Sequence, residues 1–125
     1  MPTSVMGQTQ EKEGYVVDIS SNVCEENANY VSRLVNEAID SKERVFVISK
    51  VSKGESNSLG WRRLMTAYYV LTTTTKLPSG QVVLAQGNKT TEKYGRLEFY
   101  LGGKLFLVSE AARKRNVCLS CCPGK

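Results

Sequence analysis

The sequence predicts an α+β fold, a two-layer sandwich in which two helices cover one face of a four-stranded mixed sheet. An amphipathic helix is predicted over residues 23–40, because apolar residues recur there every three or four positions. The run 44–51 holds four apolar residues in succession, as a strand buried on both faces does. With a second helix and further short apolar runs, the elements follow in the order β–α–β–α–β–β between Gly14 and Gly103.

The chain length and composition indicate one globular domain. With 125 residues, the chain can bury one hydrophobic core but is too short for two domains of ordinary size. Residues 1–13 are polar and lack periodicity, so we expect a disordered leader. The domain is predicted over residues 14–109, and residues 110–125 form a basic, cysteine-containing tail.

The first half of the domain is predicted as strand, helix and strand. Residues 14–20 form a short β run, and Asn22 precedes Glu25 by three positions, which is the spacing of a capping box. This order of elements suggests a crossover unit with parallel strands. One side of the helix carries the apolar residues Ala28, Val31, Leu34, Val35, Ala38 and Ile39.

Residues 57–72 fit either a helix or a strand. Apolar residues fall along one helical face, namely Trp61, Leu64, Met65, Tyr68 and Leu71. The aromatic and β-branched run 68–75 favours the strand alternative. We predict the helix, packed beside residues 23–40, and we place Trp61 in the core.

The second half of the domain is predicted to be mostly β-structure. Residues 76–81 resemble a hairpin turn, and strands are predicted at 81–87 and 95–102 with a polar arm between them. The two glycines at 102–103 separate apolar runs, which indicates a tight hairpin and a further strand at 104–109.

The net charge and the residue content limit the classes of function that this chain can have. The formal charge of +5 favours nucleic acid or an anionic membrane as partner over acidic proteins. The chain contains no histidine, which excludes serine–histidine and cysteine–histidine catalysis within one chain and removes the commonest zinc ligand. We therefore predict a protein that is not an enzyme and that needs no cofactor.

The N-terminus and the longest apolar runs argue against secretion and membrane insertion. No apolar run reaches the ~18 residues of a transmembrane helix. Residues 1–14 lack the basic and apolar regions of a secretory signal, so we expect a cytoplasmic or nuclear protein.

The four cysteines leave several interpretations open. Cys24 stands alone, whereas Cys118, Cys121 and Cys122 crowd into the tail. Their spacing is a weak zinc signal, so we predict no metal. A palmitoylated tail, a reduced exposed tail and an oxidised tail that links two chains are the alternatives.

Residues 29–54 carry a resemblance to a known family. The step "NYV" at 29–31 is followed by the strand "RVFVISK" and by a small basic loop that ends at Gly54. With the order of elements, this resembles the Alba family of small nucleic-acid-binding proteins. The resemblance departs in the loop before the first helix, which has no lysine here, and it therefore implies no phosphate contact at that place.

The resemblance implies a homodimer, or a heterodimer with a paralogue, that binds RNA or DNA with little sequence preference as a chromatin or ribonucleoprotein component. It also implies basic loops on one surface and β-hairpin arms that project at both ends. The candidate residues follow the strand at 44–51 or lie on the arm: Lys50, Lys53, Arg62, Arg63, Lys89, Lys93, Tyr94 and Arg96.

These side chains suit a polyanion on chemical grounds. Cations that meet phosphates release counterions, and such contacts position a protein without reading sequence. The first turn of a helix, near Arg62 and Arg63, also offers unpaired amides to anions. Tyr94 can stack on an unpaired base or pack against the base of the arm, and both roles stay open.

Two other function classes remain. The run "QVVLAQG" at 81–87 resembles the glutamine–valine loop of cystatin-like protease inhibitors, and a strand at 64–75 would favour that protein-binding class. The second alternative is a scaffold subunit of a ribonucleoprotein such as RNase P/MRP. It differs from the Alba-like prediction in its partner and not in its architecture.

Overall fold

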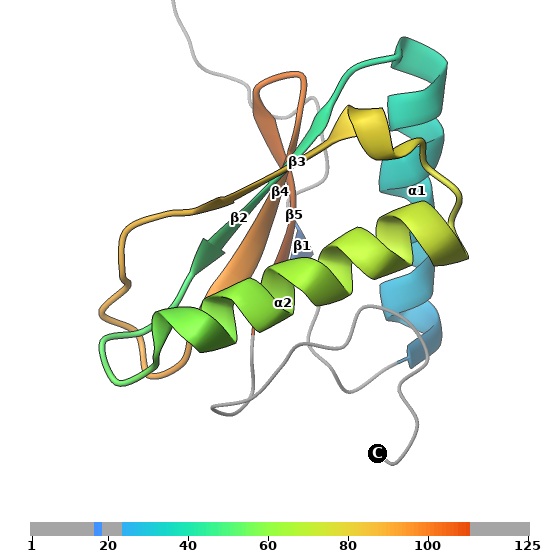
Figure 1. Cartoon of the computed structure of the whole chain (residues 1–125). Coiled ribbons are helices and arrows are strands. Elements are labelled where there is room, and N and C mark those ends of the chain that lie inside the picture. The colour runs from blue at the N-terminus through green and yellow to red at the C-terminus, as the bar shows by residue number, and fades with distance from the viewer. Residues whose placement is uncertain (1–16, 19–23, 111–125) are drawn as a thin grey trace, which may run out of the picture.

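The computed structural model describes residues 17–18 and 24–110, with side chains from residue 29 onward (Figure 1). The elements in chain order are β1 (Val17–Asp18), α1 (Cys24–Ser41), β2 (Val45–Lys50), α2 (Asn57–Tyr69), β3 (Val82–Gln86), β4 (Arg96–Leu101) and β5 (Lys104–Glu110). A π-helical turn, Val70–Thr74, continues α2, and a 3₁₀ turn, Ser79–Gln81, precedes β3.

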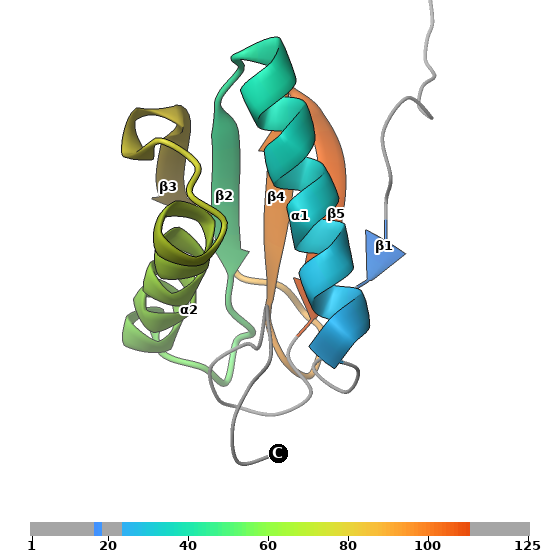
Figure 2. The same cartoon turned by 90° about the vertical axis from the view of Figure 1, so that its right-hand side faces the viewer.

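The strands form one mixed sheet in the order β1-β5-β4-β2-β3. Four strands have five or more residues, and the two-residue β1 is added at one edge. Both helices cover the same face, α1 over β4 and β5 and α2 over β2 and β3 (Figure 2). The predicted α+β class and its two-layer arrangement are therefore confirmed.

The parallel β–α–β crossover is formed by later elements of the chain than the sequence indicates. The strands predicted at 14–20 and 44–51 are not neighbours, because β5 and β4 lie between β1 and β2. Instead β2, α2 and β3 form the crossover, with β2 and β3 parallel from the pair Val45 and Val82 onward. The segment 76–81 is consequently not a hairpin turn, since it leads from a helix into a parallel strand.

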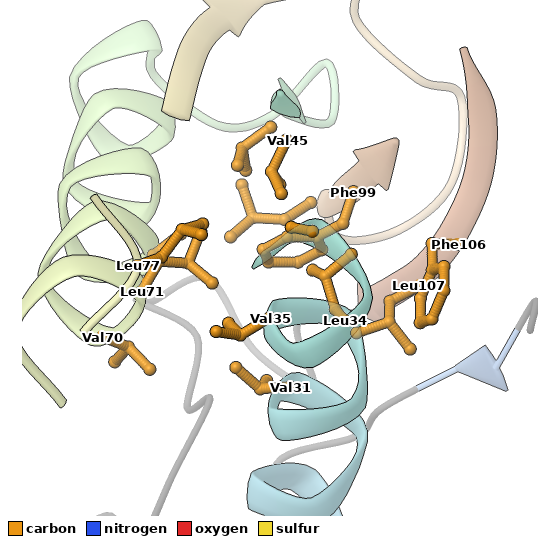
Figure 3. Close-up of a cluster of buried hydrophobic side chains, with 14 of the residues drawn as sticks. Val31, Leu34, Val35, Val45, Val70, Leu71, Leu77, Phe99, Phe106 and Leu107 are labelled. Atoms are coloured by element: carbon orange, nitrogen blue, oxygen red, sulfur yellow. The ribbon is translucent and has the colours of Figure 1, made fainter. Parts of the chain in front are cut away.

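The hydrophobic core fills the space between the sheet and the two helices (Figure 3). Helix α1 contributes one buried stripe, as its periodicity predicts, and Ile39 is the exception because 44% of its surface is exposed. The largest buried side chains of the sheet layer include Phe99, Leu97 and Leu107. The stripe of α1 consists of Val31, Leu34, Val35 and Ala38.

Strand β2 is buried on one face only, contrary to the prediction from its apolar run. Val45 and Val47 point into the core, whereas Phe46 is 40% exposed on the face that no helix covers. The apolar run thus serves two different surfaces. Its continuity does not mean that both faces are covered.

Helix α2 forms where it is predicted but presents a different face to the core. Ser56 caps it by accepting a hydrogen bond from the Leu59 amide at 3.1 Å. Its buried side includes Gly60, Arg63, Leu64 and Ala67, and Trp61 and Met65 are exposed. The prediction that places Trp61 in the core is therefore wrong.

Gly60 explains this orientation of α2. A side-chain carbon at this position would meet Gln86 Oε1, and it would lie 2.8 Å from Ser49 Oγ and 2.9 Å from Val51 Cγ1. Only glycine allows the helix to approach β2 and β3 this closely. The close approach fixes which side of α2 faces the sheet.

The end of α2 decides between the two alternatives for residues 57–72. The helix continues into the π-helical turn, where the Thr75 hydroxyl donates to the Leu71 carbonyl at 2.7 Å. Lys76, with φ of 65°, then turns the chain away. A strand at 64–75 is excluded, and with it the single-helix meander that would favour the cystatin-like alternative.

The glycine pair at 102–103 makes the predicted hairpin between β4 and β5. Both glycines have positive φ, 61° and 80°, as tight hairpin turns require. The predicted leader, Asn22 of the capping box, and the tail with Cys118, Cys121 and Cys122 lie outside the described residues, and so does the side chain of Glu25. The side chain of Cys24 lies outside them as well.

Candidate nucleic-acid interface

Two loops meet at one end of the sheet (Figure 1). They carry half of the predicted binding residues, namely Lys53, Lys89, Lys93 and Tyr94. The loop 51–56 joins β2 to α2, and the segment 87–95 joins β3 to β4. The Gly87 amide donates to the Ser49 carbonyl at 2.8 Å, and the Thr90 amide donates to the Val51 carbonyl at 2.8 Å. The two loops therefore form one connected surface.

The segment 87–95 is not the β-hairpin arm that the resemblance implies. A hairpin requires its two strands to pair with each other, but β3 and β4 flank β2 on opposite sides. The segment crosses the end of β2 and lies against the neighbouring loop, where Thr90 forms a β-bridge with Ser52.

The buried side chain of Glu55 connects the two loops. Its Oε1 accepts hydrogen bonds from the Ser52 amide at 3.0 Å and from the Gly95 amide at 3.1 Å. Arg63 donates to Oε1 at 2.9 Å and to Oε2 at 2.8 Å, and both side chains are fully buried. One carboxylate thus joins the first loop, the second loop and α2.

The hydrogen bonds keep Glu55 ionised despite its burial. Burial by itself raises the pKa of this carboxyl group, but the hydrogen bond from Arg63, the Ser52 amide and the charge of Arg63 outweigh it. The pKa of Glu55 is therefore lowered overall. Its negative charge is matched by Arg63 inside the protein, so it does not offset cations on the surface.

Arg63 must be removed from the predicted binding residues. None of its side-chain surface is exposed, so it cannot contact a phosphate from solution. It neutralises Glu55 and anchors α2 to the loops. The sequence pattern suggested a surface arginine because Arg62 and Arg63 are adjacent, but adjacent helical residues point in different directions.

Lys50 and Arg96 lie beside a buried carboxylate on the sheet face that no helix covers. Lys50 is 3.4 Å from Glu98, and Arg96 is 2.8 Å from Glu98 and 3.3 Å from Glu92. Their charges are thus largely balanced locally. These two predicted residues belong to an ion-pair cluster and contribute little net charge to the loop surface.

The same cluster shifts the pKa values of two groups. Burial raises the pKa of Glu98, but hydrogen bonds from Tyr100 and Arg96 and the charge of Lys50 lower it overall. Burial and the 2.8 Å hydrogen bond that Tyr100 donates to Glu98 raise the pKa of Tyr100 to about 12.

Four predicted cations remain exposed at the loop end, and we call them the basic loop surface. They are Lys53, Arg62, Lys89 and Lys93. Lys89 Nζ also donates to the Glu55 carbonyl at 3.0 Å, which positions this side chain against the first loop. Lys93 Nζ lies 5.5 Å from the ring centre of the half-buried Tyr94, so this tyrosine is next to the surface cations.

The two ends of the sheet differ in charge among the described side chains. At the loop end, the exposed acids are Glu92, which pairs with Arg96, and Glu110. At the opposite end, exposed cations alternate with exposed carboxylates: Lys42, Arg44, Lys76 and Lys104 accompany Glu37, Asp40 and Glu43. Positive charge that is not balanced by nearby acids is therefore concentrated on the basic loop surface.

Sequence reasoning missed Glu55, the residue that organises this end. An acid directly after Gly54 reads as a departure from a basic loop. The only signal in the sequence is the spacing of eight residues between Glu55 and Arg63. This spacing does not predict a contact, because Glu55 lies in the loop before α2 and not on the helix. Their pairing follows from the fold and not from a local pattern.

Comparisons of the chain with family models, with curated proteins and with solved structures gave no match. The resemblance to the Alba family accordingly remains a prediction. In the part of the chain that the structure describes, neither helix has the length and apolar character needed to cross a membrane.

Proposed function

We propose that this chain is a non-enzymatic binding module for RNA or DNA that contacts the phosphate backbone through the basic loop surface. The observation that carries the proposal is the fixed arrangement of two lysine-bearing loops around buried Glu55. Lys53 comes from the first loop, Lys89 and Lys93 come from the second, and Arg62 lies in the adjoining helix.

The chemistry of the surface favours phosphates over base edges. Lysine ammonium groups on flexible stems are point charges, and they suit a row of phosphates better than a defined base pattern. We therefore expect little sequence preference. Tyr94 supplies one aromatic ring beside Lys93, and that ring can stack on an unpaired base.

The two loops of the binding surface are bonded to each other. A projecting arm would contribute independently of the body, but the segment 87–95 is bonded to the loop 51–56. We therefore propose that both loops act as one surface, so that substitutions in the two loops affect binding in a coupled manner.

Self-association and a cytoplasmic or nuclear location belong to the same proposal. A second copy would double the number of phosphates within reach, and linked sites bind more tightly than separate ones. The net charge of +5 would speed the association of this protein with a polyanion in either compartment.

Salt dependence tests this function directly. Fluorescence anisotropy with labelled single-stranded RNA, single-stranded DNA and duplex DNA would be measured at three salt concentrations. Four phosphate contacts predict that log affinity falls with log salt at a slope of about −3 to −4. A slope near zero, or no binding at low salt, would contradict the proposal, and the three probes separate RNA from DNA preference.

A further inference from the structure

We propose that the exposed side of α2 is a stacking platform for the bases of a single-stranded nucleic acid. The platform, which we call the α2 stripe, comprises the side chains of Trp61, Met65 and Tyr69. The inference rests on the proposed function and deepens it, because it names an unpaired strand as the preferred substrate and adds a second contact surface to the basic loop surface.

The α2 stripe is a row of large side chains that face solvent. The three residues follow one another at intervals of four, which places them along one side of the helix. At 100° per residue, this side is opposite the one that carries the buried Arg63 and Ala67. The exposed fractions of Trp61, Met65 and Tyr69 are 47%, 53% and 61%. The stripe therefore points away from the sheet.

The composition of the α2 stripe suits unpaired bases. Trp61 and Tyr69 bring two aromatic rings to this side, and Met65 between them adds a polarizable thioether. Bases of every kind stack on aromatic rings, because each base has a π-face. Such a stripe contacts bases without reading their sequence, which agrees with the low sequence preference that we expect of the basic loop surface.

The spacing of the α2 stripe favours a single strand over a duplex. An α-helix rises 1.5 Å per residue, so successive members of the stripe are about 6 Å apart along the helix axis. In a duplex, the nucleotides of each strand follow one another every ~3.4 Å, and each base is covered by its neighbours. A strand that follows the stripe must therefore have separated bases, which a single strand allows and a duplex does not.

The α2 stripe begins beside the basic loop surface. Helix α2 starts at the loop end of the sheet, directly after the loop 51–56 (Figure 1). Arg62, a member of the basic loop surface, follows Trp61 in the chain and precedes Met65 by three residues, so it neighbours the stripe on the helix surface. One strand can therefore place its phosphates on the loop cations and its bases on the stripe.

The charge around the α2 stripe also suits a polyanion. Residues 56–91 contain no aspartate and no glutamate, so α2, the π-helical turn after it and β3 are free of acids. The acid that precedes this segment, Glu55, is buried and neutralised by Arg63. A phosphate backbone that runs along α2 therefore meets no carboxylate of the helix itself.

The two other large apolar side chains that are exposed among the described residues lie beside acids. Ile39 on α1 stands between Glu37 and Asp40 in the chain, and it has no ring. Phe46 has a ring, but it lines a hollow on the uncovered face of the sheet together with the carboxylate of Glu98. Carboxylates repel phosphates, so Phe46 is the matched control for an exposed ring in a less favourable setting.

The neighbouring cations favour a nucleic acid over a protein as the occupant of the α2 stripe. Lysine is depleted in protein interfaces, whereas the stripe adjoins a surface to which Lys53, Lys89 and Lys93 belong. A nucleic acid uses both the cations and the rings. An anionic membrane also binds cations and aromatic side chains together, and vesicles are therefore a separate arm of the test.

The fluorescence of Trp61 reports on the α2 stripe directly, because it is the only tryptophan of the chain. The full chain, with reductant present, would be titrated with oligouridylate, with duplex DNA and with vesicles that contain phosphatidylserine. Stacking should quench the emission in a saturable manner with oligouridylate and leave it nearly unchanged with the duplex. Binding of oligouridylate without quenching would overturn the proposal. An emission change with vesicles alone would assign the stripe to a membrane and would overturn it as well.

Variants of Trp61 measure what the stacking contributes to affinity. In anisotropy titrations with labelled oligouridylate, Trp61→Ala should weaken binding about 5- to 100-fold, and Trp61→Tyr, which keeps a ring, should restore most of the affinity. Phe46→Ala should bind like the wild type. If Phe46→Ala weakens binding and Trp61→Ala does not, the platform is the uncovered sheet face and the proposal is wrong. Circular dichroism would establish that each variant is folded.

The salt dependence separates this inference from the proposed function. Trp61→Ala removes no phosphate contact, so it should keep the salt slope of the wild type while its affinity for oligouridylate falls. A wild-type chain that does not bind at low salt, or binds with a slope near zero, would contradict the proposed function and the stacking platform together. Salt-dependent binding that Trp61→Ala leaves unchanged would contradict the stacking platform alone.

Discussion

The guanidinium group of Arg63 and the carboxylate of Glu55 form two hydrogen bonds, of 2.9 Å and 2.8 Å, with no exposed surface on either side chain. This pair connects α2 to both loops of the basic loop surface. Because the same carboxylate accepts two backbone amides, its removal would affect more than one ion pair. The pair is therefore the structural basis of the proposed interface.

Substitution of Glu55 and substitution of Arg63 should lower the free energy of unfolding by different amounts. Removing one partner of a buried ion pair typically costs about 3–5 kcal/mol of stability. Arg63→Met leaves a carboxylate that still accepts two amides and can take up a proton, whereas Glu55→Ala leaves a buried guanidinium group and two amides without an acceptor. We expect Glu55→Ala to lower the free energy of unfolding more than Arg63→Met, as measured by urea denaturation. An equal or reversed order would contradict this assignment.

The pH dependence of stability follows from the lowered pKa values of Glu55 and Glu98. A carboxyl group with a folded pKa below its unfolded value of 4.5 stabilises the fold above that pH and loses its contribution as the pH falls through the folded pKa. We expect the melting temperature to fall as pH decreases below about 4.5. The Glu55→Gln variant should be less stable than the wild type at neutral pH. Its melting temperature should fall less on acidification, because one titrating group is absent. A loss as large as in the wild type would exclude Glu55 as a major contributor.

Tyr100 should be a late-titrating tyrosine. Its pKa of about 12 results from burial and from its hydrogen bond to Glu98. Because the folded pKa is raised above the ordinary value of 10.0, the stabilisation is complete below pH 10.0 and is lost as pH rises through about 12. Ultraviolet titration should show one late phase that is absent in Tyr100→Phe. Its persistence in Tyr100→Phe would assign the late phase to another tyrosine.

Gly60 should tolerate no side chain. Gly60→Ala would force the new methyl group against Gln86, Ser49 and Val51, and such overpacking costs about 1–3 kcal/mol. Gly80→Ala is the matched control, because a side-chain carbon there meets no atom within 4 Å. We expect thermal unfolding to separate the two variants clearly. Equal stability of both would mean that α2 does not need the close approach at Gly60.

The sequence predicts those parts of the fold that depend on local patterns. The apolar spacing of α1, the helix at 57–72 and the glycine hairpin between β4 and β5 each follow from residues that are close in the chain. The strand partners of β3 and β4 do not follow from local patterns. The two strands resemble the halves of one hairpin, and only the whole sheet places β2 between them. Local order therefore suggested an arm where the protein has a docked loop.

The candidate site was predictable only in part for the same reason. Exposed lysines such as Lys53 and Lys93 are expected from charge alone. The burial of Arg63 and the exposure of Trp61 run against the usual preferences of these residue types. Both result from the pairing with Glu55 and from the close approach at Gly60, which are properties of the assembled structure.

The most direct test of the proposed function compares two variants of equal net charge in the anisotropy assay. The first replaces the basic loop surface, Lys53, Arg62, Lys89 and Lys93, with glutamine. The control replaces four exposed cations at the opposite end of the sheet with glutamine, namely Lys42, Arg44, Lys76 and Lys104. We expect the first variant to lose more than about tenfold in affinity for all sequences and to show a salt slope near zero, while the control keeps most of both. Equal losses in the two variants would show that binding reflects net charge alone and would contradict a defined interface at the loop end.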